Sequence, residues 1–401
     1  MAADPLLPAE ALANRFIQLS LAGSWGGPAQ SPAVAQIQAE ARTQAEALAP
    51  RLDWSVVLRQ AAAERLAPLL YHTLRQSSLL PADVLAGWRQ AYLSTAQWNV
   101  YLLHQLDEVV QRLKARNVPI LALKGVALMA TVYNQNLALR PLRDIDLLIR
   151  PAHLQVTLAV LDDLGYRPTG VEPQSGTAAA FESQLRLLKS GSLETVLEIH
   201  WSLFDSPYYQ NRLSLDWVWE NARAVELQGV ALTIPGNEAH LLYLCAHLWL
   251  HHQGAGVLWL HDIAQVMAAG RDDIDWSQVL AQAQSLELVL PLKRVLPVVA
   301  AQYGVAPAAG VLRQLDRLQP SPTEAQAFAG LAAEHLPVAS RFWTDLRGMP
   351  NWADRARFAW SNLMPSPAYM RFRYRIANSW LLPFYYPYRW LLGIRSALWK
   401  V

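Results

Sequence analysis

The stretch RPLRDIDLLIR at residues 140–150 constrains the fold more than any other part of the chain. The run DIDLLIR at 144–150 ends before Pro151 and has the length of one buried strand. Asp144 and Asp146 stand at its head, and residues two apart in a strand point to the same face. Neighbouring carboxylates repel each other unless a cation or a proton lies between them. Either these acids are a polar strand entry, or they form the edge of a metal site.

The segment around this stretch has a mixed pattern of short strand-like and helix-like runs. Helical spacing of apolar residues runs up to about residue 118, where Asn117-Val-Pro119 breaks it. Beyond that point the apolar runs become short, and glycines and prolines separate them. The pattern predicts strands at 120–123 and 144–150, helices at 126–133 and 152–165, a loop at 166–180, and a hairpin of two strands across 181–204.

The rest of the chain has helical periodicity, and no internal repeat interrupts it. We therefore expect an α+β protein in which a small mixed β-sheet is embedded in a predominantly α-helical chain. The expected division is a helical region at 1–115, the sheet-bearing core at 116–225, a helical domain at 226–338 and a basic, aromatic helical tail at 339–401.

Composition excludes several classes of protein. The chain has 401 residues, of which 53% are hydrophobic and 16% charged, so it is not a disordered polypeptide. The single cysteine, Cys245, excludes an intrachain disulfide framework and a cysteine-cluster zinc site. With neither a signal-peptide pattern nor a long apolar segment, we expect a reducing, cytoplasmic compartment. The net charge of +2 gives no reason to expect a nucleic-acid partner.

The charge is nevertheless concentrated at one end. Residues 340–401 hold ten lysines and arginines against two acids, a net charge of +8, which leaves −6 for the rest of the chain. The same segment is dense in aromatic residues, as in FRYRIANSWLLPFYYPYRW. Two interpretations stay open: helices packed on the body with a solvated basic face, or a segment that contacts a membrane surface or a protein partner.

A third acid is available to complete a metal site with Asp144 and Asp146. Glu198 lies in the predicted strand TVLEIHW, where it alternates with Ile199 and shares a face with His200. Ligands that offer only oxygen suit Mg²⁺ or Mn²⁺, which also bind substrate phosphates. Three such carboxylates favour a metal-assisted phosphoryl or nucleotidyl transfer site. Glu198 could equally be a surface acid on an edge strand.

The segment before the acids offers groups for a phosphate. Lys124-Gly125 follows the first predicted strand and precedes a helix, where free backbone N–H groups and a glycine allow close approach. Arg140 and Arg143 flank the acids and could bind phosphate oxygens or pair with the aspartates. Each feature alone is common in turns and on surfaces. Their order along the chain is what favours a triphosphate site.

This order resembles the uncharacterised bacterial nucleotidyltransferase family of the DNA-polymerase-beta-like superfamily. LKGVAL, LRPLRDIDLLIRPAHL and LEIHWSL carry the resemblance, supported by AERLAPLLYHTL, EAHLLYLCAHLWLHH, VLWLHDIAQVM and IDWSQVL, over roughly residues 55–300. It implies that Asp144, Asp146 and Glu198 bind metal, with Glu198 as a ligand or a general base. Lys124, Gly125, Arg140, Arg143 and His200 would contact the nucleotide. Lys124-Gly125 stands where the superfamily usually has Gly-Gly or Gly-Ser.

A second group of polar residues lies in the predicted helices after residue 236. His247 and His251 are four residues apart and share a helical face, His252 is adjacent, and His261-Asp262 follows. Three interpretations stay open. The side chains pack between helices; or they bind a metal in a His-Asp phosphohydrolase; or His247, His251 and Asp262 line the nucleotide cleft.

The sequence therefore supports two main hypotheses. The first is a Mg²⁺- or Mn²⁺-dependent enzyme that moves a nucleoside monophosphate from a nucleoside triphosphate to a small-molecule or protein acceptor. The second is a non-catalytic protein of the same fold that binds a nucleotide or docks a partner. Absence of the Gly-Gly or Gly-Ser turn favours the second, and presence of all three acids favours the first.

Overall fold

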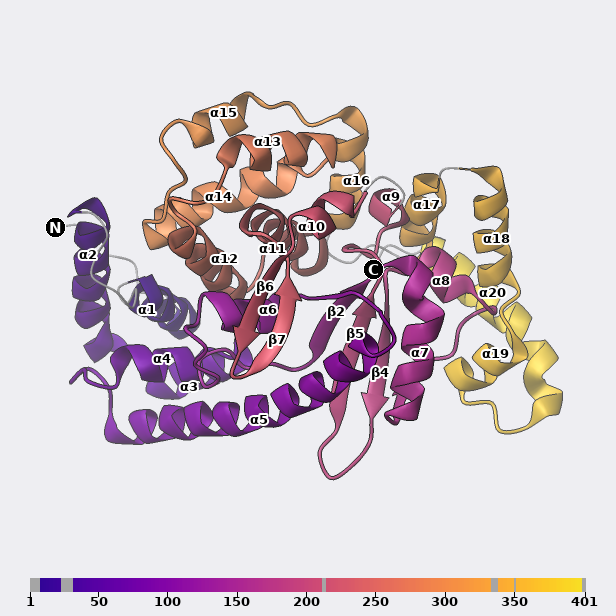
Figure 1. The fold of residues 1–401 in the computed structure, drawn as a ribbon, viewed down its shortest axis with the longest axis horizontal. Helices are drawn as coiled ribbons and strands as arrows, with labels where there is room; N and C mark the ends of the chain where they lie inside the picture. The colour runs from indigo at the N-terminus through magenta and orange to yellow at the C-terminus, as the bar shows by residue number, and fades with distance from the viewer. Residues whose placement is uncertain (1–7, 23–31, 211–213, 333–337, 350, 399–401) are drawn as a thin grey trace.

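Two layers of helices enclose a small sheet in the computed structural model, which describes residues 8–22, 32–210, 214–332, 338–349 and 351–398. In Figure 1 the first four helices lie at one end of the molecule and the tail helices at the other, and the long fifth helix runs from the first end to the sheet between them. The N-terminal helices are α1 (Ala9–Ala22), α2 (Pro32–Leu48), α3 (Trp54–Ala63), α4 (Ala67–Leu74) and the long α5 (Ala82–Lys114).

The central sheet has five strands in the order β1-β2-β5-β4-β3. Only β2 and β5 run parallel, and the other neighbours are antiparallel. The strands are β1 (Ile120–Ala122), β2 (Ile145–Ile149), β3 (Tyr166–Pro168), β4 (Gln184–Lys189) and β5 (Thr195–His200). Every side chain of β2 is buried, as expected for a strand with neighbours on both sides. The α+β class predicted from the sequence is thus confirmed.

Short helices connect these strands. Helix α6 (Lys124–Thr131) follows β1, α7 (Leu154–Asp163) follows β2, and α8 (Thr177–Phe181) precedes β4. A separate hairpin, β6 (Arg223–Leu227) with β7 (Val230–Ile234), comes after α9 (Pro207–Gln210) and α10 (Asp216–Glu220). Residue 225, at which the sequence predicted that the sheet-bearing core ends and the next helical domain begins, lies inside this hairpin.

Helices from both halves of the chain share one hydrophobic core. It joins α1, α3 and α4 to the helices that follow the hairpin, while a second core lies between the sheet, α5 and α7. The later helices are α11 (Asn237–His252), α12 (Val257–Ala269), α13 (Trp276–Ser285), α14 (Val289–Tyr303), α15 (Val311–Arg317) and α16 (Pro322–Ala332). Helices α1, α3 and α4 therefore pack with residues 237–303 as one body, while the C-terminal half of α5 packs on the sheet.

The tail is helical, as its composition predicted. It consists of α17 (Val338–Gly348), α18 (Trp352–Leu363), α19 (Pro367–Tyr374) and α20 (Leu382–Leu398). In the part of the chain that the structure describes, no helix is both long and apolar enough to cross a membrane.

Three details of the sequence prediction were wrong. Strand β2 begins at Ile145, so Asp144 lies just before the strand instead of inside it. The segment 166–180, expected as a loop, contains β3 and most of α8. The hairpin β6–β7 was not predicted. Each of its strands is only five residues long, and the side of each strand that faces solvent carries few apolar residues.

Candidate functional site

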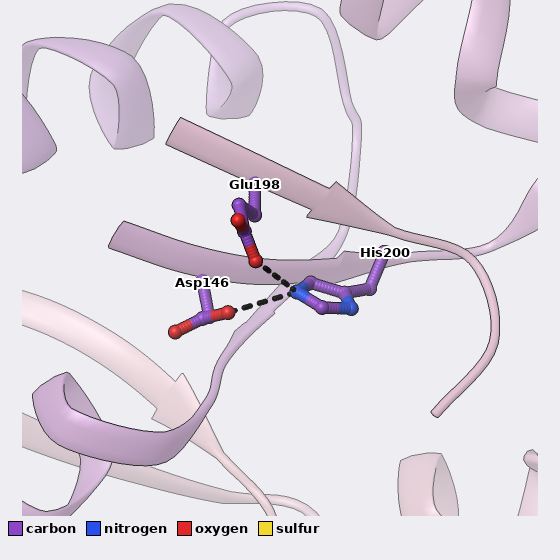
Figure 2. Close-up of side chains that lie close together, drawn as sticks. All are labelled: Asp146, Glu198 and His200. Carbon is purple, nitrogen blue, oxygen red and sulfur yellow. Dashed lines mark hydrogen bonds and ion pairs between the residues drawn. The ribbon is translucent and has the colours of Figure 1, made fainter. Parts of the chain in front are cut away.

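Two acids face each other across the parallel pair of strands. Asp146 of β2 lies opposite Glu198 of β5, and His200 follows two residues later on the same face. The His200 Nε2 atom lies 2.9 Å from Asp146 Oδ1 and 3.9 Å from Glu198 Oε2. Figure 2 shows the three side chains converging from the two strands. One ligand atom from each lies within 4.8 Å of the others, so the three could hold one metal ion.

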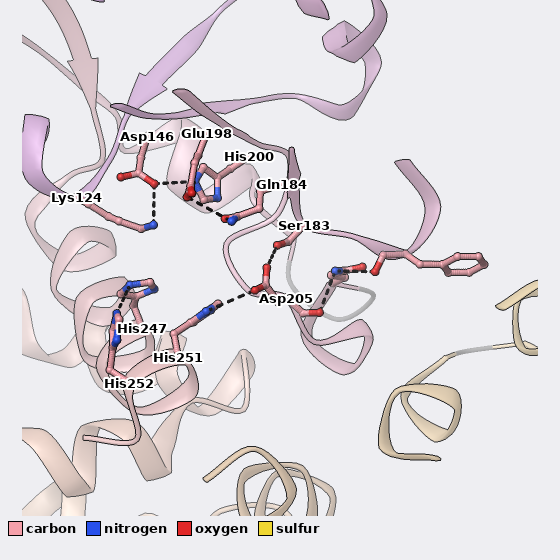
Figure 3. Close-up of polar contacts among 12 residues, drawn as sticks. Lys124, Asp146, Ser183, Gln184, Glu198, His200, Asp205, His247, His251 and His252 are labelled. Carbon is pink, nitrogen blue, oxygen red and sulfur yellow. Dashed lines mark hydrogen bonds and ion pairs between the residues drawn. The ribbon is translucent and has the colours of Figure 1, made fainter. Parts of the chain in front are cut away.

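Lys124 reaches the same carboxylate from the first position of α6, just after β1. The amide of Leu123 donates to the Asp146 carbonyl at 3.0 Å, which brings the end of β1 beside β2. The Lys124 Nζ atom then donates to Asp146 Oδ1 at 2.7 Å (Figure 3). Lys124 has a φ of +46°, an uncommon backbone conformation for a residue with a side chain. Backbone strain of this kind tends to occur at functional positions, where the surrounding structure holds it.

The charges in this group depend on one another. Burial alone would raise the pKa of Asp146, but the Lys124 charge and the His200 hydrogen bond hold the pKa of that carboxyl well below its usual range. Burial, with the Asp146 charge, raises the pKa of Glu198 to about 7. Burial lowers the pKa of His200. The site therefore holds one permanent carboxylate beside one acid that titrates near neutral pH.

Asp144 stands slightly apart from this group. It is half-buried on the loop before β2, and the burial and the Asp146 charge raise its pKa. Among the described residues, the compact set of metal-ligating atoms is Asp146, Glu198 and His200, without Asp144. Two carboxylates with one imidazole fit a divalent cation, and an imidazole suits Mn²⁺ better than Mg²⁺.

A buried asparagine on α5 holds the loop that carries Asp144. The Asn99 amide donates to the carbonyl of Leu137 at 2.7 Å and to that of Arg140 at 2.8 Å, and its oxygen accepts from the Leu142 amide at 3.2 Å. Asn99 has no exposed surface. Because one side chain satisfies three backbone groups of the loop, it fixes the path of the chain into β2.

Arg140 is held by a buried acid from α12. Its guanidinium Nη2 lies 2.8 Å from Asp262 Oδ2, and the Tyr133 hydroxyl donates to the same carboxylate at 2.5 Å. The Arg140 guanidinium also lies over the Trp259 ring, 5.3 Å from its centroid. Asp262 is fully buried behind Arg140 and does not line the cavity.

A cavity of about 330 Å³ lies in front of the acids. One wall consists of the β-sheet residues and the loop before β2. The opposite wall comes from α11 and α12, and Arg65 closes one side from the turn between α3 and α4. The side chains that line it are Arg65, Lys124, Gly125, Arg140, Leu142, Arg143, Asp144, Asp146, Gln184, Glu198, His247, His251, His252 and Trp259.

Gly125 is required here by packing. A Cβ atom at this position would lie 2.3 Å from Leu142 Cδ2 and 3.7 Å from an Arg140 guanidinium nitrogen. Any side chain would have to displace the buried Leu142 side chain, which packs in the loop that leads into β2. This close contact accounts for the glycine independently of the phosphate contact predicted from the sequence.

Three of the four histidines of α11, His247, His251 and His252, pack on one another beside the cavity (Figure 3). The His247 and His252 Nε2 atoms are 3.2 Å apart, and the His247 and His251 rings stack with centroids 4.6 Å apart. Burial lowers the pKa of His247 well below its usual value and, with the His251 charge, that of His252 to about 4. The His247 and His252 rings are therefore neutral at pH 7. Asp262 points away to Arg140, so the ligand set of a His-Asp phosphohydrolase is not assembled.

Several cavity residues had no sequence signal. Arg65 follows α3 with a φ of +58°, and its segment drew notice only as part of a helical resemblance. Gln184 lies opposite His200 in β4, and its amide donates to Glu198 Oε2 at 3.3 Å. Asn99, which holds the loop before β2 without lining the cavity, looks like any polar residue of a long helix. Each is recognisable only when the tertiary structure places it.

Comparison with known proteins matches this region to a family. The model of a family described as uncharacterised nucleotidyltransferase matches residues 50–304. A crystal structure of an antigenic nucleotidyltransferase-like protein from Paracoccidioides brasiliensis is similar at 12% sequence identity and a TM-score of 0.31, over 56% of this chain and 96% of that one. No curated protein matches the chain. Because the family match covers most of the chain and every residue that lines the cavity, the chain belongs to the uncharacterised nucleotidyltransferase family.

Proposed function

We propose that this protein is a divalent-metal-dependent nucleotidyltransferase, which moves a nucleoside monophosphate from a nucleoside triphosphate to a hydroxyl or phosphate acceptor and releases pyrophosphate. The observation that carries the proposal is the pairing of Asp146 and Glu198 across β2 and β5, at the floor of a cavity that guanidinium groups also line. The family membership supports transfer of a nucleotidyl group. The polymerase-beta-like ancestry and the cytoplasmic location remain predictions from the sequence.

The acids would hold the metal ion. Asp146 and Glu198 offer the carboxylate oxygens, and either Asp144 or His200 completes the set. Bound there, a divalent cation neutralises charge that develops on the phosphates and positions them for in-line displacement. Lys124 supplies the counter-charge to Asp146 when the cation is absent, through the 2.7 Å contact of its ammonium group.

The guanidinium groups would bind the triphosphate. Arg65, Arg140 and Arg143 all line the cavity, and burial together with the charges of the other two lowers the pKa of Arg65. Like charges gathered in this way repel each other, which a polyanion would relieve. Arg140 is committed to Asp262, so Arg65 and Arg143 have the greater freedom to move toward phosphate oxygens.

Glu198 is suited to accept the proton of an acceptor hydroxyl. This role is the alternative to binding the metal ion, because a carboxyl group that binds a cation stays ionised. Without a bound cation, a pKa of about 7 leaves a substantial fraction of both protonation states near neutral pH, which favours general base catalysis. The Gln184 amide donates to Glu198 Oε2 and orients the carboxyl group.

A second cavity provides space for the acceptor. It has a volume of about 400 Å³ and lies between β4, α8 and the tail helices α17 and α18. Gln184 lines both cavities, so the second opens beside Glu198. Phe181 and Phe358 form one wall of it, and Glu182 and Arg186 contribute charged groups. A cavity of this size accommodates a small molecule or a side chain of a protein acceptor.

One observation favours the second hypothesis, a non-catalytic protein that binds a nucleotide or a partner. The Lys124 ammonium already neutralises Asp146 from a distance of 2.7 Å. Because the ammonium group already compensates the buried carboxylate charge, the fold does not require a metal ion at Asp146.

Nucleotide binding and turnover distinguish the two functions. Full-length protein is titrated with ATP, GTP, CTP and UTP in the presence of Mg²⁺ or Mn²⁺, and pyrophosphate release is measured with hydroxyl-bearing acceptors. Asp146→Asn and Glu198→Gln are compared with Glu194→Gln, which removes an exposed acid from the loop between β4 and β5. Loss of turnover in the two site variants alone supports the transferase. Binding without turnover supports the non-catalytic protein, and no binding by the unmodified protein refutes both.

A further inference from the structure

The tail exposes large apolar side chains far more than the rest of the protein does. Sixteen large hydrophobic side chains are exposed among the described residues, and twelve of them lie between Trp343 and Ile394. Trp352, Trp380 and Phe384 are 80%, 69% and 68% exposed. Single exposed apolar residues are ordinary, whereas a concentration of them marks an interaction site.

These side chains follow the period of the helices. In α18, Trp360 and Leu363 lie eight and eleven residues after Trp352, so the three side chains share one face of the helix. In α20, Tyr388 and Leu391 lie four and seven residues after Phe384, so these three side chains likewise share one face. Both helices therefore have an outward apolar face. We call these faces, together with Trp380 in the short 3-10 helix Ser379–Leu381 and the exposed residues of α17 and α19, the tail surface.

The inner sides of the same helices are attached to the body. On α18, the Phe358 ring packs against Phe181 with centroids 5.4 Å apart, and Arg357 donates to the Gly176 carbonyl at 3.2 Å. Helix α20 is fixed to the end of α18, because the Trp390 indole donates to the Leu363 carbonyl at 2.8 Å. Helices α18 and α20 thus meet at this junction, at one end of the molecule (Figure 1).

The tail surface also has a strong positive charge. Residues 340–401 carry a net charge of +8, against −6 in the rest of the chain. Arg347, Arg355, Arg373 and Arg375 are exposed, while the two acids of the segment, Asp345 and Asp354, are half-buried. Arginines interspersed with tryptophan, phenylalanine and leucine match the boundary between anionic headgroups and acyl chains.

We propose that the tail surface binds the surface of a membrane that contains anionic phospholipid. Its indole and phenyl groups enter the headgroup boundary, and its arginines pair with lipid phosphates. The helices lie on the membrane, because none of the described ones is long and apolar enough to cross it. This inference rests on the tail alone and is independent of nucleotide transfer.

Flotation of the full-length protein tests the proposal. Vesicles of phosphatidylcholine alone are compared with vesicles that contain about 30% phosphatidylglycerol. The variant Trp352→Ala/Trp380→Ala/Phe384→Ala removes three highly exposed tail residues. Its matched control, Leu93→Ala/Val100→Ala/Leu193→Ala, removes three exposed apolar residues from the body. We expect the unmodified protein and the control to float with the anionic vesicles, and the tail variant to bind at least about tenfold less.

A second pair of variants tests the role of charge. Arg347→Gln/Arg373→Gln/Arg375→Gln should reduce flotation and its dependence on salt, and Arg51→Gln/Arg112→Gln/Arg271→Gln should not. Equal flotation of the aromatic tail variant and its control would overturn the proposal, as would no preference for anionic vesicles. Sedimentation supplies another refuting outcome: a dimer of the unmodified protein that the aromatic tail variant converts to a monomer, since a second copy would then cover the surface.

Discussion

Arg140 and Asp262 form a buried ion pair that joins two distant parts of the chain. They are 122 residues apart, one on the loop before β2 and the other on α12, and their side chains are 3% and 0% exposed. The Arg140 Nε atom also donates to both carboxylate oxygens, at 3.1 and 3.0 Å. This pair sets the position of the helical wall of the cavity relative to the sheet.

Removing the acid of this pair should destabilise the protein strongly. In Asp262→Ala the Arg140 charge stays buried without its partner, and we expect a loss of about 3–5 kcal/mol in the free energy of unfolding. Urea denaturation measures this, with Asp272→Ala at an exposed position as the control. A loss below about 1 kcal/mol would mean that the pair is not buried in solution.

Lys124 should compete with a metal ion for Asp146. In Lys124→Met the buried Asp146 carboxylate loses its ammonium partner, so the protein should be destabilised by about 3–5 kcal/mol. Mn²⁺ should then raise the melting temperature of this variant more than that of the unmodified protein, because the cation replaces the missing charge. Lys114→Met, at an exposed position, is the control. Identical Mn²⁺ responses in all three proteins would contradict a metal site at Asp146.

Metal affinity should rise with pH through the range in which Glu198 titrates. With a pKa of about 7, Glu198 is largely protonated at pH 6 and largely ionised at pH 8. A ligand must be deprotonated, so we expect Mn²⁺ affinity to increase about tenfold between these values. Calorimetric titration at both pH values measures this, and Glu198→Gln should remove most of the dependence. An equally steep dependence in Glu198→Gln would assign it to another group.

The same pKa has an opposite effect on the metal-free protein. The pKa of Glu198 is raised above its ordinary value of 4.5, so the folded state binds the proton more tightly than the unfolded state does. The stability contributed by this group is complete below about pH 4.5 and is lost as the pH rises through 7. Denaturation of Glu198→Gln without metal should therefore show a smaller loss of stability between pH 5 and pH 8 than the unmodified protein shows.

Asn99 should matter for both stability and activity. Asn99→Leu leaves buried carbonyls of Leu137 and Arg140 and the amide of Leu142 without partners, at a cost of at least about 2 kcal/mol. Nucleotide binding should weaken as well, since the loop carries Arg140 and Arg143. Gln90→Leu, on the exposed side of the same helix, is the control for urea denaturation and nucleotide titration. Unchanged nucleotide affinity in Asn99→Leu would show that the position of this loop does not affect nucleotide binding.

The sequence was most informative where local geometry alone determines orientation. Alternation in TVLEIHW put Glu198 and His200 on one face, and the structure has them so. Alternation could not reveal that β5 lies beside β2, because the register of two strands separated by α7, β3, α8 and β4 depends on packing of the whole sheet.

Sequence patterns could not identify interaction partners that come from distant segments of the chain. A place in the cleft was one of three open interpretations for Asp262, which follows His261 near other histidines, and the structure instead pairs it with Arg140. Arg65 reaches the cavity from a turn of the N-terminal region that no motif marks. Both positions follow from the way helices of the two halves share a core, which is a property of the folded chain.

The order of strands also bears on how the protein is made. β5, which occupies the middle of the sheet, is the last of its five strands to be synthesised. Until Thr195–His200 have been added, Asp146 has neither Glu198 nor His200 beside it, and the growing chain has no complete set of ligands. Lys124 precedes Asp146 in the chain and can neutralise it from the start. The nascent chain thus already contains the counter-charge of Asp146. It can bind a metal ion with all of these ligands only after β5 has completed the sheet.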